Sequence, residues 1–560
     1  MVRGVKAQTG SCRPLGVLRS DSRFVILVIL IVVITTSVPP VFGYLSTPKD
    51  KWFSGIVYNV HDAAQYLSWM REAGNSLFAQ NKLTSESNAP IFLNLHWWIP
   101  GRLGHILRLS LPSVYEGFRL FSIPLFIISL YLWCSELFPE RSRRRFALLL
   151  TVFTSGLGWV WVLLKQVTGT LAFPLDVYVM MGNSFYTMMA SPHLTFAAAL
   201  TVLVLYLAIK GHRQQRFGYS LGAALLALFL GMGHIYDVVT VWTVLGVFGL
   251  LLMLRDGWSW QAFWRLALVV LVSAPSVLYW GWVSSSANPM WKQALSQYDS
   301  LQVFTPDPAH LLILLGLTFM VAVVTFDGVV HLRRQTDRQL FVKGWFGATL
   351  LLIYLPFRFR VMLLTGYQLP MAVLATWGLF GRILPWLQEC LDKGHWRNLL
   401  SHERLGRWVP TLFLLAVLPT NVYLTAWRVV DLGRHDYPFY LYGDDIEAMH
   451  WLEENTSPDD VVLSSFTIGQ YIPGLTGNRA FLSNSVMTLD SSRKEAMVRA
   501  FFDLATSDRE REALLRQYNI HYLFYGPAER ALGAFRPGES ELFSLVFSSA
   551  NTNVYVVQAR

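Results

Sequence analysis

Residues 24–44 read FVILVILIVVITTSVPPVFGY. The stretch carries no charged side chain, and a helix of roughly 20 apolar residues is long enough to cross the hydrocarbon core of a bilayer. A basic leader precedes it, with Arg3, Lys6, Arg13, Arg19 and Arg23. A signal peptide would begin in the same way, but no small-x-small cleavage site follows, so we expect an uncleaved membrane anchor.

Ten further stretches have the length and the apolar character of a membrane span. They lie near residues 113–136, 146–164, 194–210, 217–233, 237–254, 264–283, 309–326, 343–357, 361–380 and 408–428. Charged residues make up 15% of the chain and apolar residues 53%, whereas soluble proteins carry about 25% charged residues. We therefore expect a polytopic α-helical membrane protein with about eleven transmembrane helices.

The short loops between these spans predict their orientation, because cytoplasmic loops are enriched in Lys and Arg. Alternate loops are basic here, at residues 140–145 (ERSRRR), 210–216, 333–343 and 382–407. The N-terminus is then cytoplasmic, and an odd number of spans makes the C-terminal part extracytoplasmic. The expected location is the plasma membrane, crossed many times.

The formal net charge of +10 reflects this loop bias. Residues 431–560 are instead acidic, with 18 Asp and Glu against 11 Lys and Arg, so no nucleic-acid partner is expected. Cys12, Cys134 and Cys390 show no metal-binding spacing. All three would lie on the cytoplasmic side, where thiols stay reduced.

Two of the expected outer loops are long, at residues 46–112 and 165–193, and loops of this length are usually functional. In the first, residues 63–78 place apolar side chains on one helical stripe, which predicts a helix lying flat in the membrane interface. The stripe consists of Tyr66, Leu67, Met70, Ala73 and Leu77. A second piece, residues 91–109, is too polar to span and is also expected to lie flat.

The sequence changes character near residue 435. Helical patterns at residues 444–455 and 493–518 alternate with short apolar strands at 461–465, 521–525, 542–547 and 554–557. This alternation predicts a small α/β domain. We expect two domains, a membrane domain over residues 1–434 and an extracytoplasmic α/β domain over residues 435–560.

Polar residues gather at the outer ends of the expected spans. A charge at membrane depth is costly and usually marks a cavity or a function. The residues concerned are His61, Asp62, Asp176, His193, His234, Asp237, Arg358 and Arg360. They come from five segments, yet the topology brings them to one face of the membrane.

Asp62 is the candidate catalytic residue, because a carboxylate near an acceptor hydroxyl or amine can act as a general base. The alternative is an ordinary helix N-cap. Arg358 and Arg360 break the positive-inside pattern, and guanidinium groups bind phosphate oxygens in a bidentate fork. The alternative for this pair is snorkelling to lipid headgroups.

The other residues are candidates for binding the substrate. His193 would hydrogen-bond a phosphate or carry a proton, unless it is a simple interfacial cap. His234 and Asp237 share a tight turn and would position a substrate or contribute to a metal site, and Asp176 is a possible second carboxylate. No compact ligand cluster appears in the sequence, so no metal cofactor is expected, although a divalent ion is compatible with these residue types.

Several chemical motifs are absent from the sequence. It contains no G-x-x-x-x-G-K-[ST] phosphate loop, no G-x-S-x-G elbow and no H-E-x-x-H helix. ATP-driven transport, α/β-hydrolase chemistry and zinc-protease chemistry are therefore not indicated.

Taken together, these features resemble the C-type (GT-C) superfamily of glycosyltransferases, integral membrane enzymes that use polyprenyl-phosphate sugars. The resemblance rests on the long first loop with HDAAQYL at residues 61–67, on the Arg358 and Arg360 pair, and on the tail. In the tail it rests on WLEENTSPDDVVL at residues 451–463 and IPGLTGNR at residues 472–479. The tail segments are similar to the soluble domain of uncharacterised bacterial members.

The resemblance implies that Asp62 deprotonates the acceptor or binds a metal. Members often have two adjacent acids in this loop, whereas the first position here is His61, which is expected to line the site. The W-W-D-Y-G signature of oligosaccharyltransferase catalytic subunits is missing, which argues against transfer of a preassembled glycan to asparagine. The expected function is transfer of a sugar from a polyprenyl-phosphate carrier to a lipid, glycan or protein acceptor. The alternatives are a transporter of lipid-linked sugar or polysaccharide, and a non-catalytic assembly protein of the same fold.

Overall fold

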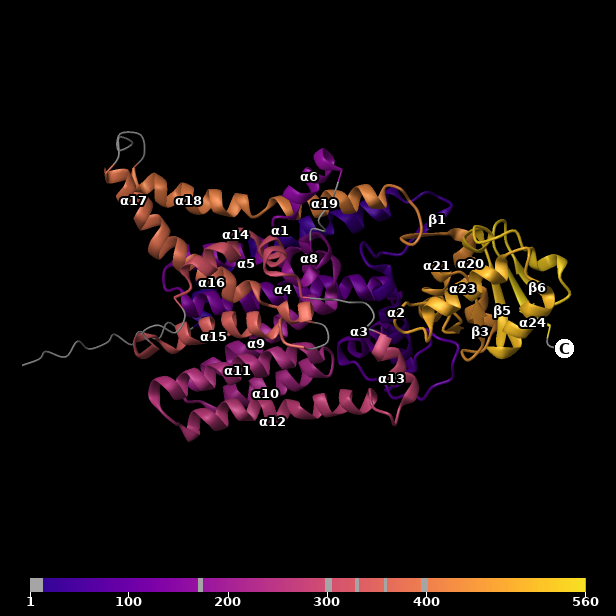
Figure 1. Ribbon diagram of the computed structural model, residues 1–560, viewed down its shortest axis with the longest axis horizontal. Coiled ribbons are helices and arrows are strands. Elements are labelled where there is room, and N and C mark those ends of the chain that lie inside the picture. Colours follow the sequence, from indigo (N-terminus) through magenta and orange to yellow (C-terminus); the bar gives the residue numbers. More distant parts are fainter. Residues whose placement is uncertain are drawn as a thin grey trace, which may run out of the picture.

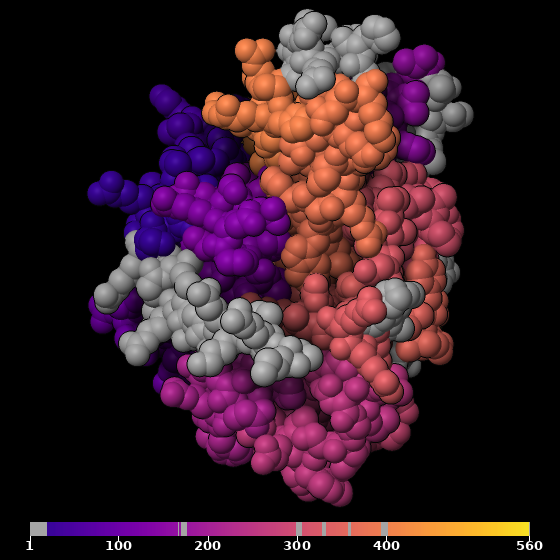
Figure 2. Space-filling model, turned by 90° about the vertical axis from the view of Figure 1, so that its left-hand side faces the viewer, coloured from indigo at the N-terminus to yellow at the C-terminus, as the bar shows by residue number. Residues whose placement is uncertain are grey.

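The computed structural model describes residues 14–169, 175–297, 305–327, 332–356, 360–393 and 401–558. Long helices lie side by side, and one end of this bundle carries a domain built around a β-sheet (Figure 1). We call that domain, residues 443–558, the C-domain, and the end of the bundle that meets it the C-domain end. Figure 2 looks at the opposite end, from which the C-domain is not visible.

Seven helices among the described residues are long and apolar enough to cross a membrane. They are α1 (Pro14–Ser46, apolar from Ser20), α4 (Leu111–Leu137), α9 (Pro192–Gln214), α11 (Ile235–Asp256), α12 (Trp260–Val283), α14 (Pro308–Thr325) and the pair α18 (His402–Ala416) and α19 (Pro419–Leu432). The remaining expected spans are also helical: α5 (Arg141–Phe153) with α6 (Gly158–Thr168), α10 (Phe217–Gly231), α15 (Asp337–Leu352), and α16 (Gln368–Gly378) with η5 (Leu379–Ile383) and α17 (Leu384–Lys393). The prediction of a polytopic α-helical membrane protein is confirmed.

The centre of the bundle is α9. It packs against α4 and α10, and α10 packs against α12. Residues 197–199 of α9 are three alanines, all almost completely buried, and small side chains let neighbouring helices approach closely. Pro192 occupies the first turn and Arg213 the last turn, positions that favour helix initiation and suit the helix dipole.

Two of the spans are broken where they meet. α5 and α6 are bent by 42° relative to each other, and α14 contains a non-helical residue, Gly316, with φ of 64°. A Cβ on Gly316 would lie 2.5 Å from the carbonyl oxygen of Ser155, and one on Gly156 would lie 2.4 Å from that of Ile313. Irregular backbone is tolerated at membrane depth when protein covers it. Here the irregular segment of each span packs against that of the other.

The opposite end of the bundle is held by a buried carboxylate in α1. Asp21 accepts from Arg141, Arg144 and Arg145 at 2.6, 2.8 and 2.7 Å, and the hydroxyl of Tyr131 donates to it at 2.8 Å. The arginine-rich turn that the sequence analysis assigned to an inner loop therefore ties α5 to α1 and α4.

The C-domain contains a five-stranded sheet in the order β4-β3-β5-β7-β6. The strands are β3 (Val461–Leu463), β4 (Arg479–Ala480), β5 (Ile520–Tyr525), β6 (Phe543–Ser548) and β7 (Asn553–Val557). β3 runs parallel to β4 and β5, whereas β7 is antiparallel to β5 and β6. The small C-terminal α/β domain is confirmed.

The helices of the C-domain differ in one place from the expectation. The first, α20 (Gly443–Asn455), lies where it was predicted, but residues 493–518 form two helices, α23 (Ser491–Phe502) and α24 (Asp508–Gln517). The second begins with a capping box, in which Ser507 and Glu510 satisfy each other's backbone N–H groups. That local signal starts a new helix.

The first long loop folds into α2 (Val60–Asn75) and α3 (Leu95–Ile106), joined to the C-domain by short pieces. Most of α2 is buried, because α3 covers one side of it and α22 (Ile472–Leu475) of the C-domain covers another. A Cβ on Gly101 would lie 2.5 Å from the carbonyl oxygen of Met70, and one on Gly474 would lie 2.9 Å from the Cβ of Leu67. α2 is therefore packed inside the protein instead of lying flat at an interface.

We call the contact between residues 71–88 and the C-domain the seam. Two ion pairs cross it: Lys494 with Glu86 at 2.8 Å, and Arg71 with Glu453 at 2.7 Å. Lys82 pairs with Glu72 inside the loop at 3.0 Å and donates to the carbonyl oxygen of Gly477 in the C-domain at 2.8 Å. Next to the seam, β1 (Lys51–Phe53) pairs antiparallel with β2 (Tyr440–Tyr442). The first loop and the C-domain are thus joined by charges, backbone hydrogen bonds and packing.

Candidate functional site

Asp62 lies in the first turn of α2, at the C-domain end of the bundle. Asn59 is the N-cap of this helix and accepts from the backbone N–H of Asp62 at 3.4 Å, while its own amide donates to Oδ2 of Asp62 at 2.6 Å. The simple capping role is therefore filled by Asn59. The Asp62 carboxyl is half-buried, with a neutral amide as its hydrogen-bond partner.

This environment changes the acidity of Asp62. Burial disfavours the charged carboxylate and raises its pKa to about 6, although the hydrogen bond from Asn59 acts in the opposite direction. A carboxylate with a pKa close to neutrality is a stronger base than an ordinary aspartate and is still ionised at pH 7. The position suits a group that takes a proton from an incoming nucleophile.

One helical turn after Asp62, Tyr66 connects α2 to α9. The Tyr66 hydroxyl lies 3.1 Å from Nε2 of His193, and Nδ1 of His193 lies 3.1 Å from Oγ of Ser191. The Tyr66 ring stacks on Trp97 of α3, with centroids 4.3 Å apart. His193 is therefore held on both ring nitrogens and placed beside two aromatic rings.

His234 and Asp237 form a second pair at the start of α11. Nδ1 of His234 lies 2.7 Å from Oδ2 of Asp237, and the ring centroids of His234 and His193 are 6.0 Å apart. Asp237 is fully buried, and its second oxygen, Oδ1, has no hydrogen-bond partner in the structure. The structure thus brings His193, His234 and Asp237 together, as the topology predicted.

A third histidine, His96 of α3, joins this cluster. Both of its ring nitrogens are buried without a hydrogen-bond partner, and burial together with the nearby His234 lowers its pKa to about 3. Gly233 makes room for it, because a Cβ there would lie 2.1 Å from the His96 ring. We call the set His96, His193, His234 and Asp237, with Tyr66 above it, the histidine cluster.

Of the two candidate arginines, the structure describes Arg360 but not Arg358. Arg360 opens the short helix η4 (Arg360–Leu364), which packs against α11 and against η1 (Met180–Gly182). It therefore belongs to an element that adjoins the helix of the His234 and Asp237 pair. Arg358 lies outside the described residues, so its proposed partnership with Arg360 stays a prediction.

His61 and Asp176 lie outside the histidine cluster. The exposed His61 ring packs on Phe466 of the C-domain at 5.0 Å, and its backbone oxygen accepts from Asn484 at 2.8 Å. Asp176 is completely buried where α6, α14 and α19 meet, and it accepts from the backbone N–H of Gly158 at 2.9 Å. Asp176 thus caps the broken α5–α6 span, which gives it a structural function at that junction.

Asn59, Trp97 and His96 were not predicted as site residues, and Tyr66 was predicted only as part of an apolar stripe. The spacing Asn59-x-x-Asp62 is a recognisable cap signal, and Tyr66 follows Asp62 by four residues on one helix face. Nothing local in the sequence marks His96, because His193, His234 and Asp237 come from segments about 100 residues away or more.

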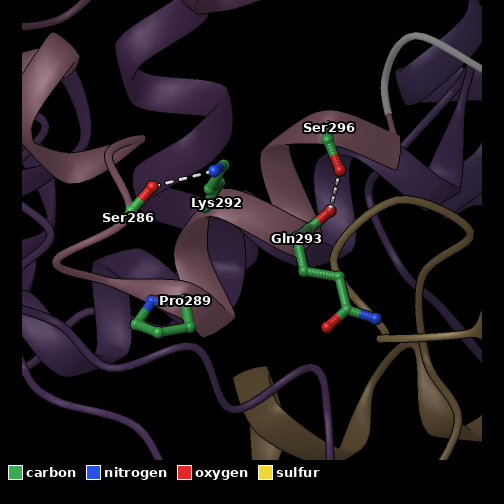
Figure 3. A pocket seen from close by; sticks show the side chains of 5 residues that line it. All are labelled: Ser286, Pro289, Lys292, Gln293 and Ser296. Atoms are coloured by element: carbon green, nitrogen blue, oxygen red, sulfur yellow. Dashed lines mark hydrogen bonds between the residues drawn. The ribbon is translucent and has the colours of Figure 1, made fainter.

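Two ligand-binding possibilities can be judged from the geometry. Among the described residues, no group of three or more His, Cys, Asp or Glu side chains is arranged to hold a metal ion. A hollow of about 330 Å³ opens beside α13 (Pro289–Ser296), where Lys292 Nζ donates to Ser286 Oγ at 2.9 Å (Figure 3). Gln293 in its wall lies 3.3 Å from Oδ1 of Asp490, so the hollow borders the C-domain.

Comparison with solved structures identifies the fold. The crystal structure of the Archaeoglobus fulgidus oligosaccharyltransferase in its apo form aligns over 97% of this chain and 75% of its own length, with a TM-score of 0.54 and 12% identity. The cryo-EM structure of the arabinofuranosyltransferase AftD from Mycobacteria aligns over 95% of this chain and 42% of its own, with a TM-score of 0.50 and 14% identity. No protein-family model matches the chain, and no curated protein matches its sequence.

Both of these structures are GT-C glycosyltransferases. The chain therefore has the GT-C fold, as its sequence pattern suggested, and it is a multi-pass membrane protein of that architecture.

Proposed function

We propose that this protein is a membrane glycosyltransferase that moves a single sugar from a polyprenyl-phosphate carrier to an acceptor. The observation that carries the proposal is the Asp62 carboxyl, whose pKa is raised to about 6 at the junction of the helical bundle and the C-domain. The GT-C fold supports the reaction class. The acceptor is a lipid, a glycan or a protein, and the reaction takes place on the extracytoplasmic face, with the N-terminus in the cytoplasm.

In the proposed reaction, Asp62 takes the proton of the acceptor hydroxyl or amine. The acceptor atom then attacks C1 of the donor sugar, and the bond from C1 to the phosphate oxygen breaks with inversion. The phosphate is bound at the C-domain end by Arg360, with Arg358 as its expected partner. No metal cofactor is part of this proposal.

The C-domain would hold the acceptor. His61 meets Phe466 and Asn484 at the surface between α2 and the C-domain, one residue before Asp62. The exposed imidazole of His61 against the ring of Phe466 suits a sugar or another polar acceptor, because the two rings offer a flat apolar face and a hydrogen-bonding group. The buried amide of Asn484 holds the backbone of His61 in place.

The test is turnover of lipid-linked sugar by the purified protein in liposomes that contain mixed polyprenyl-phosphate hexoses and pentoses. Consumption of one donor would name the sugar, and Asp62→Asn is expected to lower transfer by about 10²–10⁴-fold. Asp50→Asn is the matched control, because Asp50 is an exposed acid in the same loop, and its transfer should equal that of the unmodified protein.

Two results would overturn the proposal. Full transfer by Asp62→Asn would remove the general base. Absence of transfer with any donor, combined with movement of the lipid between leaflets, would identify a transporter.

A further inference from the structure

The His234 and Asp237 pair has the geometry of an acid–base dyad. An ionised carboxylate can only accept hydrogen bonds, so the 2.7 Å contact between Nδ1 of His234 and Oδ2 of Asp237 fixes the proton on Nδ1. The atom left for chemistry is Nε2. A carboxylate behind an imidazole also stabilises the imidazolium that forms when Nε2 takes a proton.

The other two histidines of the cluster cannot take this part. His193 is engaged on both nitrogens, by Tyr66 and Ser191. His96 is held among the rings of Phe196 and Phe229, and its pKa of about 3 keeps it neutral. Of the three, His234 alone has a carboxylate within hydrogen-bond distance.

The position of the pair suits the leaving group of the reaction. Tyr66 follows Asp62 by one turn of α2 and contacts His193, whose ring lies next to that of His234. Arg360 belongs to η4, which packs against α11, the helix that begins just after His234. A chain of side-chain contacts through Tyr66 and His193 therefore links the helix that carries Asp62 to the His234 dyad.

We propose that His234, protonated and held by Asp237, donates Nε2–H to the phosphate of the polyprenyl carrier and protonates it as the sugar leaves. When the bond between C1 and the phosphate oxygen breaks, the electron pair stays on that oxygen, and the phosphate gains one negative charge. The His234 proton moves to the phosphate while Asp62 receives the acceptor proton. This assignment rests on the proposed glycosyl transfer. It gives the phosphate a second cationic partner besides Arg360.

In this scheme His234 is a catalytic residue and Asp237 is a positioning residue. Oδ1 of Asp237 is buried and has no hydrogen-bond partner in the structure, so the protein leaves one acceptor atom of this carboxylate unsatisfied.

Binding of the product lipid, polyprenyl phosphate, tests the assignment without turnover. A hydrogen bond to a charged group typically changes affinity by about 10-fold to 100-fold. His234→Gln and Asp237→Asn should each weaken the binding of polyprenyl phosphate by this factor, and Asp237→Glu, which keeps the carboxylate, should recover part of it. Asp62→Asn should bind the lipid as tightly as the unmodified protein.

The matched control is His310→Gln. His310 and Asp307 form a similar pair three residues apart at the start of α14, but both are exposed. This variant should leave the binding of polyprenyl phosphate and the transfer rate unchanged. Melting temperatures of all variants in detergent verify that the fold is intact, and Asp237→Asn serves in place of His234→Gln if the latter does not fold.

The outcomes separate the two proposals. If the unmodified protein transfers sugar and His234→Gln binds polyprenyl phosphate normally, the dyad assignment is wrong and the proposed function stands. If the unmodified protein transfers no sugar from any donor, the proposed function itself fails. Equal loss of binding in His310→Gln would show that the effect is unspecific, and the assignment would be overturned.

Discussion

The seam and the histidine cluster both bury polar groups, but they treat them differently. In the seam, Nζ of Lys494 is surrounded by the hydroxyls of Thr84 and Ser85 and by the carboxylate of Glu86, at 2.8–3.2 Å. In the cluster, His96 has no hydrogen-bond partner on either nitrogen, and Oδ1 of Asp237 has none.

Under the proposed function, this difference separates polar groups that hold the fold together from polar groups that meet the substrate. Buried polar groups in native proteins are almost always satisfied, and each exception calls for an explanation. The seam uses its charges to fix the C-domain onto the first loop. The cluster contains buried hydrogen-bonding atoms without a protein partner, and a phosphate or an acceptor would bind to them.

The largest expected effect comes from breaking the seam. Lys494→Met removes the buried cation of an ion pair whose acid, Glu86, is one-third exposed, and it also leaves the hydroxyls of Thr84 and Ser85 without their donor. The loss should approach, at most, the cost of about 3–5 kcal/mol of breaking a fully buried pair. Denaturant unfolding of the purified protein should show this loss, while transfer per folded molecule should change little. A variant with normal stability and lost transfer would reverse the roles of the two regions.

The C-domain also contains a buried carboxyl group, that of Glu529. Burial raises the pKa of Glu529 from 4.5 to about 7. Its two oxygens accept from the backbone N–H groups of Ser465 and Gly526 at 2.7 and 2.9 Å. The folded state holds this proton more tightly than the unfolded state, so stability should fall as the pH rises from about 4.5 to 7, by about 3 kcal/mol in total.

Melting temperatures measured at pH 5 and pH 8 check this prediction. In Glu529→Gln the part of the pH dependence that belongs to this residue should disappear, even though one backbone hydrogen bond is lost. An unchanged pH dependence in the variant would exclude Glu529 as its source.

A smaller effect is expected from crowding the histidine cluster. In Gly233→Ala the new methyl group would meet the ring of His96 at 2.1 Å, so the ring or the turn before His234 must shift, at a cost of about 1–3 kcal/mol. The free energy of polyprenyl phosphate binding should decrease by more than the free energy of unfolding does. Gly246→Ala is the control, because a Cβ there meets no atom within 4 Å.

The smallest effect belongs to an exposed ion pair that contrasts with the seam. Glu495 and Arg499 lie one turn apart on α23, with 43% and 69% of their side chains exposed. Exposed pairs of this kind contribute about 0.3–0.5 kcal/mol. Glu495→Gln should therefore unfold almost as the unmodified protein does, and a loss comparable to that of Lys494→Met would show that exposure does not distinguish the two pairs.

The part of the fold that local sequence determines was predictable. Residues 24–44 and the other apolar stretches are helical because each satisfies its own backbone hydrogen bonds, and the change of composition near residue 435 marks the α/β domain. The burial of α2 was not predictable, since its cover includes α22, about 400 residues later in the chain. The apolar stripe of α2 indicates that one face of the helix is covered, but it does not identify the covering element.

The candidate site was predictable to a similar extent. Topology brought His193, His234 and Asp237 to one place, because the outer ends of neighbouring spans must meet. It also included Asp176, which the structure places at the junction of α6, α14 and α19. The sequence alone cannot say which side of a helix end faces the histidine cluster, and that choice separates Asp176 from the histidines.

The pairing of β1 with β2 imposes an order on biosynthesis. Lys51 is the partner of Tyr442, so the ribosome must add nearly 400 residues before the first strand meets its mate. At 5–20 residues per second this takes roughly 20–80 s. Throughout that interval the nascent loop around Asp62 lacks its cover, because α22, which packs on α2, is synthesised later still than β2.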